Sequence, residues 1–163
     1  AYTIGPLPFG YYGLGDLAVF ISFGPVAVLG TDYIQTRQIT TLAALAAVPM
    51  GSLITAILVV NNLRDADTDR AAGKRTLAVL LGRRGARIEF IALMGAAYAV
   101  PPILWLGYGF RPWVLAPLLT LPLALRLVRT ILTVIGASLN RALAGTAQLT
   151  IWYALAFAIG ILI

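Results

Sequence analysis

The sequence predicts an all-α protein, a multi-pass bundle of about five transmembrane helices that forms a single membrane domain over residues 1–163. Hydrophobic residues make up 60% of the chain, and its mean hydropathy is +0.91. Charged residues make up only 11%, far below the roughly 25% of soluble domains. Apolar runs of about 20 residues, the length that crosses a bilayer, recur along the whole chain.

The first two predicted spans lie close together. Residues 14–34 form an apolar run with Asp16 and Asp32 near its ends, and residues 41–60 belong to a stretch, residues 38–60, that carries no charge. The second span is rich in small residues that allow helices to approach closely in a membrane. These are Ala43, Ala44, Ala46, Ala47, Gly51 and Ser52.

Three further spans follow. Residues 88–108 contain Pro101 and Pro102, which we expect to kink this helix or split it into two segments. Residues 112–128 begin with a proline, which the first turn of a helix tolerates. Residues 142–163 complete the set, so that four connections join five helices.

Lysine and arginine are distributed unevenly over these connections. Ten of the twelve basic residues fall between the second and third helices or between the fourth and fifth, which places both connections on the cytoplasmic side. The uncharged N-terminal stretch is expected on the same side. Three segments should therefore converge at one face of the bundle.

The composition also excludes several kinds of chemistry. The chain has no histidine and no cysteine, which removes histidine acid–base catalysis, cysteine nucleophiles and disulfides. Its net charge of +6 comes from bases that flank apolar runs. The expected partners are therefore anionic membrane lipids or a polyanionic substrate, and no nucleic acid.

An unusual concentration of acids follows the second span. If that helix continues past Val60, then Asn61, Asp65 and Asp69 are spaced four residues apart and stack on one helix face, whereas Asp67 points to the opposite side. Such a row of oxygen ligands suits Mg²⁺, which takes one or two carboxylates and completes its coordination with water and phosphates.

Four bases surround this row: Arg64, Arg70, Lys74 and Arg75. They suit the phosphate oxygens that a metal leaves uncovered, which indicates a diphosphate whose apolar tail enters the bilayer. A simpler interpretation stays open at this point: the charges could only orient the helices and pair with one another at the surface, where such pairs contribute little.

Other phosphate-binding motifs do not fit. The residues at 73–76 lack the spacing of a P-loop, and Gly10, Gly13 and Gly15 have the wrong order for a dinucleotide fingerprint. Intramembrane CDP-alcohol phosphotransferases also use aspartates with Mg²⁺, but Asp69 is not followed by the second acidic pair that they need.

Two segments resemble a known family. "NNLRDADTDRAAGKRTLAVLLG" (residues 61–82) is similar to the second aspartate-rich motif of UbiA-type intramembrane prenyltransferases, and "YTIGPLPFGYYGLGDLAVFISFGPVAVLGTDYIQT" (residues 2–36) is similar to the stretch that precedes it. Within that family, the segments are most like the enzymes that prenylate 1,4-dihydroxy-2-naphthoate in menaquinone biosynthesis.

The resemblance implies a nine-helix bundle in which two aspartate motifs hold Mg²⁺ and a polyprenyl diphosphate. The five helices predicted here match the last five. The first motif, of the Asn-Asp-x-x-Asp kind, does not occur in this sequence. We therefore expect the chain to be the C-terminal part of such a protein, with an incomplete active site on its own.

The resemblance also implies roles for single residues. Asp65 and Asp69 match the catalytic metal ligands, and Asn61 and Asn62 match the amides that precede them. Arg70 and Lys74 fall where bases contact the diphosphate, and Asp67 matches a frequent acidic position. Tyr2 is a candidate for the aromatic acceptor's pocket, with an interfacial anchor as the alternative.

The function implied is Mg²⁺-dependent transfer of a polyprenyl group to 1,4-dihydroxy-2-naphthoate with decarboxylation, giving demethylmenaquinone, in a bacterial inner (plasma) membrane. Two alternatives stay open. The acceptor could be another aromatic acid, such as 4-hydroxybenzoate or homogentisate, or the protein could be a non-enzymatic quinone- or lipid-binding membrane protein.

Overall fold

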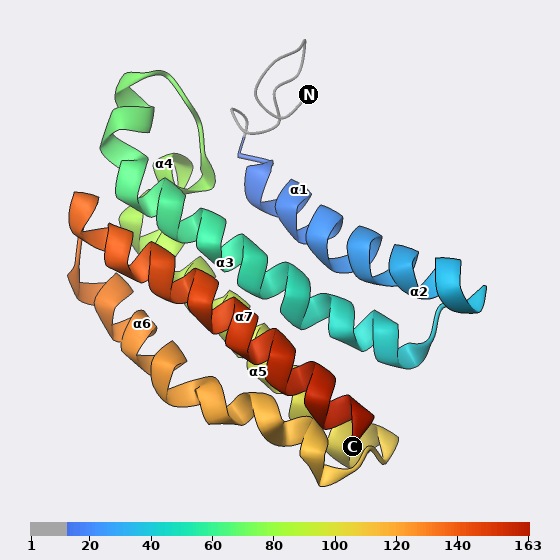
Figure 1. Ribbon diagram of the computed structural model, residues 1–163. Coiled ribbons are helices and arrows are strands. Elements are labelled where there is room, and N and C mark those ends of the chain that lie inside the picture. The colour runs from blue at the N-terminus through green and yellow to red at the C-terminus, as the bar shows by residue number, and fades with distance from the viewer. Residues whose placement is uncertain (1–12) are drawn as a thin grey trace.

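A computed structural model describes residues 13–163, and all regular secondary structure in this range is helical. Within it, five helical segments are long and apolar enough to cross a membrane: Gly15–Thr36, Thr41–Ala71, Gly82–Tyr108, Pro112–Thr133 and Gly136–Leu162. The predicted fold class and number of spans are confirmed (Figure 1).

The first span changes helix type along its length. It consists of α1 (Gly15–Ile21), the π-helical η2 (Ser22–Leu29) and α2 (Gly30–Thr36), which follow one another without a break. Pro25 lies inside η2, where its missing N–H disturbs the regular α-helical ladder. The span ends at Arg37, whose φ of 60° reverses the chain.

The second helix, α3 (Thr41–Ala71), has 31 residues. At 1.5 Å per residue it is about 46 Å long, more than the ~30 Å hydrocarbon core of a bilayer. It begins at Thr40, whose hydroxyl accepts a 3.1 Å hydrogen bond from the Ala43 amide. It continues 11 residues beyond the predicted end at Val60, so the condition for stacking the acids on one face is met.

The third span follows the short helix α4 (Leu77–Leu80) and forms α5 (Gly82–Tyr108). The expectation that Pro101 and Pro102 could split this helix is wrong, because α5 passes through both without interruption. The flanking Val100 and Leu104 are buried in the core, and this packing offsets the lost backbone hydrogen bonds.

The last two spans each begin with 3₁₀ turns. η3 (Pro112–Thr120) leads into α6 (Leu121–Thr133), and η4 (Gly136–Leu139) leads into α7 (Asn140–Leu162). Relative to the predicted ranges, the third and fifth spans each begin six residues earlier, and the fourth ends five residues later.

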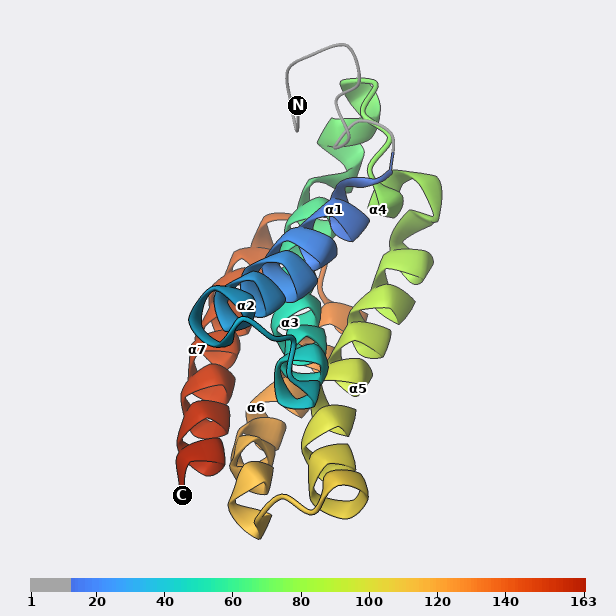
Figure 2. The same ribbon diagram turned by 90° about the vertical axis from the view of Figure 1, so that its right-hand side faces the viewer.

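α3 lies at the centre of the bundle and contacts α1, η2, α5 and α7 (Figures 1 and 2). η2 approaches it through two glycines. A Cβ added to Gly24 would come within 2.7 Å of the Ala47 carbonyl oxygen, and one added to Gly51 within 2.9 Å of the Phe20 carbonyl oxygen. The small residues of this span therefore allow the close packing that the sequence predicted.

One end of the bundle gathers the segments on which the site depends. The C-terminal end of α3, α4, the start of α5 and the connection between α6 and α7 lie together there (Figure 1). Arg87 of α5 donates a 2.9 Å hydrogen bond to the Ile131 carbonyl of α6. The start of the described chain joins them, because Gly13 packs against Leu80 and Arg75.

Candidate functional site

The polar site is built on the last three turns of α3. Asn61 and Asp65 are half-buried, and Asp69 is buried, with 7% of its surface exposed. Because the helix continues to Ala71, these three residues follow one another at single-turn intervals. The structure therefore places the three side chains in a row along one helix face, as the spacing predicted.

Arg64 lies at the centre of this site. Its Nε and Nη2 donate to the two carboxylate oxygens of Asp65 at 2.7 and 2.6 Å, and Nη2 also donates to the Asn61 amide oxygen at 2.8 Å. Its Nη1 donates at 2.9 Å to Oδ1 of Asn140, the first residue of α7. A bidentate pair of this kind fixes a guanidinium in both distance and orientation.

The oxygens of the row are arranged in a way that suits a metal ion. Oxygens of Asn61 and Asp65 converge on one cationic group, the guanidinium of Arg64. Oxygen ligands that converge on a positive charge suit Mg²⁺. The same oxygens cannot, however, bind Mg²⁺ and the Arg64 guanidinium at the same time. The donor set fits a divalent ion provided that Arg64 turns away.

Asp69 forms the second ion pair of the site. Its Oδ1 accepts a 2.9 Å hydrogen bond from Lys74 Nζ. Lys74 reaches back because the chain turns at Gly73, with φ of +74°, and because the Lys74 amide donates to the Asp69 carbonyl at 2.9 Å. The tight turn after α3 thus brings Lys74 back to Asp69, the last acid of the row.

The remaining predicted bases and the third acid lie outside the row. Arg70 is exposed, and its Nη2 is 3.5 Å from the Val79 carbonyl oxygen, while Arg75 is also exposed. Asp67 points away, as predicted from the helical period, and pairs with Arg83 of α5 at 2.5 Å. The structure therefore brings Arg64 and Lys74 to the row but not Arg70 and Arg75.

Asn62 lies beside the row and contacts the first span. Its Nδ2 donates a 3.3 Å hydrogen bond to Oδ1 of Asp16 in α1, and both residues are buried. This buried polar pair joins α1 to α3 beside the row. The apolar pattern placed Asp16 near the end of the first span and gave it no partner, although an acid inside an apolar span is itself a signal for a polar partner.

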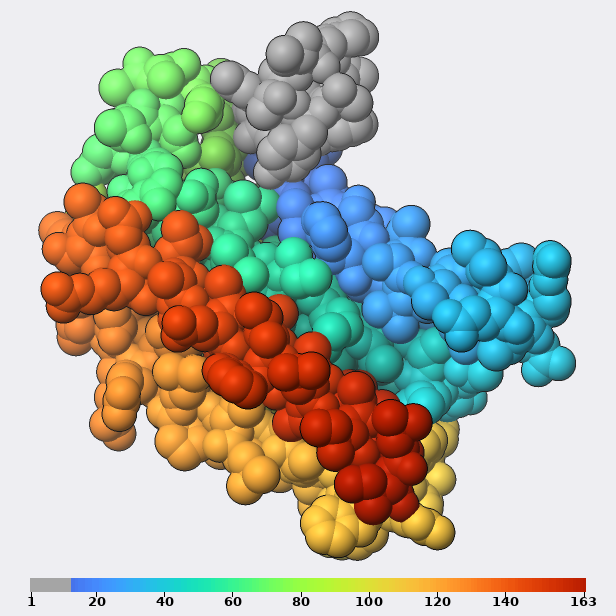
Figure 3. Space-filling view, viewed as in Figure 1, coloured from blue at the N-terminus to red at the C-terminus, as the bar shows by residue number. Residues whose placement is uncertain are grey.

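An apolar groove opens below the row, between the first span, α3 and α7. Its volume is about 500 Å³. It is lined by Val19, Phe23, Ile54, Ile57, Leu58, Asn61, Asn140, Leu143, Ala144 and Ala147. Asn61 and Asn140 are its only polar lining residues, and Arg64 bridges them. Figure 3 shows α3 exposed between α1 and α7 along this side.

Among residues 13–163, no three acidic residues gather closely enough to form a complete metal site. A metal on this row would therefore draw further ligands from substrate phosphates or water, as Mg²⁺ commonly does. Tyr2, the predicted acceptor-pocket residue, lies outside the described residues.

Comparisons with known proteins identify related sequences. The sequence profile of the UbiA prenyltransferase family matches residues 1–144. The 1,4-dihydroxy-2-naphthoate octaprenyltransferase of Mycobacterium tuberculosis is 46% identical over 125 residues, which are 77% of this chain and 42% of the relative. The enzyme of the same name from Bacillus subtilis is 33% identical over 167 residues, or 99% of this chain and 52% of the relative.

A vertebrate protein is similar over the same extent. UbiA prenyltransferase domain-containing protein 1 of Xenopus tropicalis is 35% identical over 162 residues, which are 99% of this chain and 45% of that protein. The chain thus spans about half the length of the curated relatives it matches. With the family profile covering most of its residues and five helices long and apolar enough to span a membrane, this chain belongs to the UbiA prenyltransferase family of multi-pass membrane proteins.

Proposed function

We propose that this chain supplies the second aspartate motif of an enzyme that transfers a polyprenyl group from polyprenyl diphosphate to 1,4-dihydroxy-2-naphthoate, with loss of CO₂, to give demethylmenaquinol, the reduced form of demethylmenaquinone. The observation that carries the proposal is the position of the charged row at the mouth of the apolar groove. Asn61 belongs to both, and Arg64 links it to Asp65. Such a junction matches a substrate with a diphosphate head and an apolar tail.

Prenyltransferases of this family generally use a divalent metal. We propose Mg²⁺, held by Asn61, Asp65 and Asp69 together with substrate phosphates and with the family's first motif, which would come from residues outside this sequence. When bound, Mg²⁺ would neutralise charge on the diphosphate as the leaving group departs. Asn62 is not included, because its amide donates to Asp16.

The bases have a direct part in this proposal. Arg64 and Lys74 already contact the acids of the row, and a diphosphate would offer both side chains stronger anionic partners. Arg64 would exchange Asp65 for phosphate oxygens as the carboxylate takes up the metal. Arg70 and Arg75, which are exposed near this end, would add attraction for the diphosphate without a fixed contact.

The reaction needs no histidine. The ring carbon that bears the carboxylate attacks the allylic carbon, while the allylic C–O bond breaks and its electron pair leaves with the diphosphate. The bond to CO₂ then breaks, and its electrons restore the aromatic ring. The groove, lined by Phe23, Ile57 and Leu143 among others, would hold the tail and keep water from the allylic carbon.

The names of the curated relatives favour this acceptor over 4-hydroxybenzoate or homogentisate, because several of them are named 1,4-dihydroxy-2-naphthoate octaprenyltransferase. We further propose a bacterial plasma membrane with the site on the cytoplasmic side, since ten of the twelve basic residues fall within residues 64–87 and 126–141, the two segments that include the connections at that end.

An acceptor competition assay tests the proposal. Membranes containing the enzyme with both aspartate motifs would receive polyprenyl diphosphate, Mg²⁺ and equal amounts of the three aromatic acids, and we expect prenylated product and CO₂ from the naphthoate alone. Asp65→Asn should abolish turnover, whereas Asp67→Asn, the matched control, should leave it unchanged. Absence of product from all three acids would favour the non-enzymatic interpretation, and unchanged turnover in the Asp65→Asn protein would refute the role that we propose for the row.

A further inference from the structure

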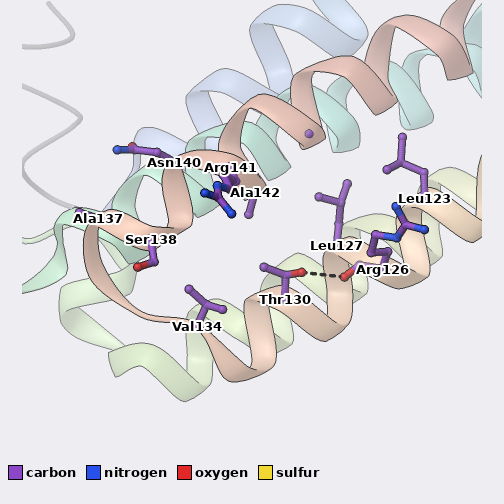
Figure 4. A pocket seen from close by; sticks show the side chains of 11 residues that line it. Leu123, Arg126, Leu127, Thr130, Val134, Ala137, Ser138, Asn140, Arg141 and Ala142 are labelled. Carbon is purple, nitrogen blue, oxygen red and sulfur yellow. Dashed lines mark hydrogen bonds between the residues drawn. The ribbon is translucent and has the colours of Figure 1, made fainter.

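A second groove lies on the other side of α7, between α6, η4 and α7, and we call it the α6/α7 groove. Its volume is about 810 Å³. It is lined by Leu123, Arg126, Leu127, Thr130, Val134, Ala137, Ser138, Asn140, Arg141, Ala142 and Gly145 (Figure 4). No carboxylate lines it, which separates its chemistry from that of the aspartate row.

Two guanidinium groups from different helices share this groove. Arg126 comes from α6 and Arg141 from α7, and in Figure 4 each side chain extends into the space between the two helices. Across residues 13–163, the three ion pairs use Arg64, Lys74 and Arg83, and neither groove arginine has a side-chain hydrogen bond. Two positive charges therefore face one cavity without an acid to pair with.

The position of Arg126 along α6 favours an anionic partner. It lies seven residues before the end of α6 at Thr133, about 10 Å along the helix axis. A cation this far inside an apolar span is costly unless it reaches water or an anion. Arg126 and Arg141 could meet both needs if the head group of a membrane lipid enters the groove from the interface.

The floor of the groove is apolar. Leu123 and Leu127 line its α6 side, and a Cβ added to Gly145 of α7 would lie 2.9 Å from Leu127 Cδ2, so the helices close together below the arginines. The neighbouring surface carries exposed Leu125 and Leu132, which suit contact with acyl chains. A charged mouth above an apolar surface matches an amphiphile better than a free anion.

We propose that the α6/α7 groove is a binding site for an anionic phospholipid of the phosphatidylglycerol kind, with its phosphate between Arg126 and Arg141 and its acyl chains along α6. Basic pockets between transmembrane helices on the cytoplasmic side commonly recognise such head groups. The hydroxyl of Ser138, exposed beside Arg141 in the groove lining, offers a further donor to the head group. The proposal does not depend on the prenyltransferase reaction.

Native mass spectrometry of the purified chain, offered equal amounts of phosphatidylglycerol and phosphatidylcholine, tests this site. We expect retention of phosphatidylglycerol, about fivefold weaker in Arg126→Gln and in Arg141→Gln and about 25-fold weaker in the double variant. Arg129→Gln is the matched control, because Arg129 is an exposed arginine of α6 that does not line the groove. Circular dichroism would verify that each variant keeps its helices.

Three results would overturn the proposal. The first is equal retention of both lipids. The second is a loss of lipid retention in Arg129→Gln as large as in the groove variants, which would show only that basic residues near helix ends attract anionic lipids in general. The third is full displacement of the lipid by inorganic phosphate, which would make the groove a site for free anions. Retention that depends on Arg126 and Arg141 and resists inorganic phosphate would support it.

Discussion

Arg64 of α3 and Asn140 of α7 are 76 positions apart in the sequence, and a 2.9 Å hydrogen bond from Nη1 to Oδ1 joins them. This bond fixes the start of α7 against the aspartate row and closes the polar end of the apolar groove. The same guanidinium donates to Asp65 and Asn61. One side chain therefore connects two helices and contacts two candidate metal ligands.

Asn140→Ala should loosen this connection. We expect the free energy of unfolding to fall by about 0.5–1 kcal/mol, because one hydrogen bond to a partly exposed charged group is lost. Thermal unfolding followed by circular dichroism measures the change. Ser138→Ala, two residues earlier and without a described side-chain hydrogen bond, is the control; an equal loss there would disprove a specific role for the Arg64 bond.

Arg64→Gln should change metal and diphosphate binding in opposite directions. Removal of the guanidinium frees the oxygens of Asn61 and Asp65, so the Mg²⁺ concentration for half-maximal activity should fall. The KM for polyprenyl diphosphate should rise about tenfold, because a charge-assisted hydrogen bond to phosphate is lost. Arg83→Gln, which breaks only the Asp67 pair, should alter neither value. A higher Mg²⁺ requirement in Arg64→Gln would contradict the competition between the two cations.

The groove below the row should limit the substrate's tail. Ala147 lines this groove on α7, and Ala147→Phe would fill part of its volume of about 500 Å³. We expect turnover of long-chain donors to fall more than turnover of short-chain donors. Ala158→Phe, at an exposed position of the same helix, is the matched control. Equal effects on both chain lengths would argue against this groove as the path of the tail.

The buried pair of Asp16 and Asn62 should matter for stability rather than for turnover of the folded protein. Asp16→Ala leaves the Asn62 amide without its acceptor, at a cost of about 1–3 kcal/mol. Asp16→Asn keeps an oxygen that Asn62 can donate to and should unfold at or above the original temperature. If both variants were equally damaging, the charge and not the hydrogen bond would be the important property.

The contact between η2 and α3 provides a test of packing. In Gly24→Ala the new methyl group would meet the Ala47 carbonyl oxygen at 2.7 Å, so the helices must separate. We expect a loss of about 1–3 kcal/mol, typical of overpacking. Gly30→Ala is the control, since a Cβ there meets nothing within 4 Å. Equal unfolding temperatures for the two variants would show that η2 and α3 can move apart at this contact without loss of stability.

Much of the fold followed from local sequence patterns. Apolar runs identified all five spans, and the four-residue spacing from Asn61 to Asp69 predicted the row because helical geometry depends only on neighbours along the chain. Hydropathy indicates where the chain leaves the apolar part of the membrane, but a helix can continue beyond that point. For that reason the span that was predicted to end at Val60 continues to Ala71, and α5 passes through Pro101 and Pro102.

The sequence by itself therefore determined a membrane bundle of the UbiA type with its acids, amides and bases at one end. Only the tertiary structure decided which of them meet: Arg64 with Asn140 and Asn62 with Asp16. It also placed Arg126 and Arg141 in the lining of one groove. These pairs join residues of different helices. Side-chain partners of that kind depend on how helices pack and cross, which no periodic pattern within one helix specifies.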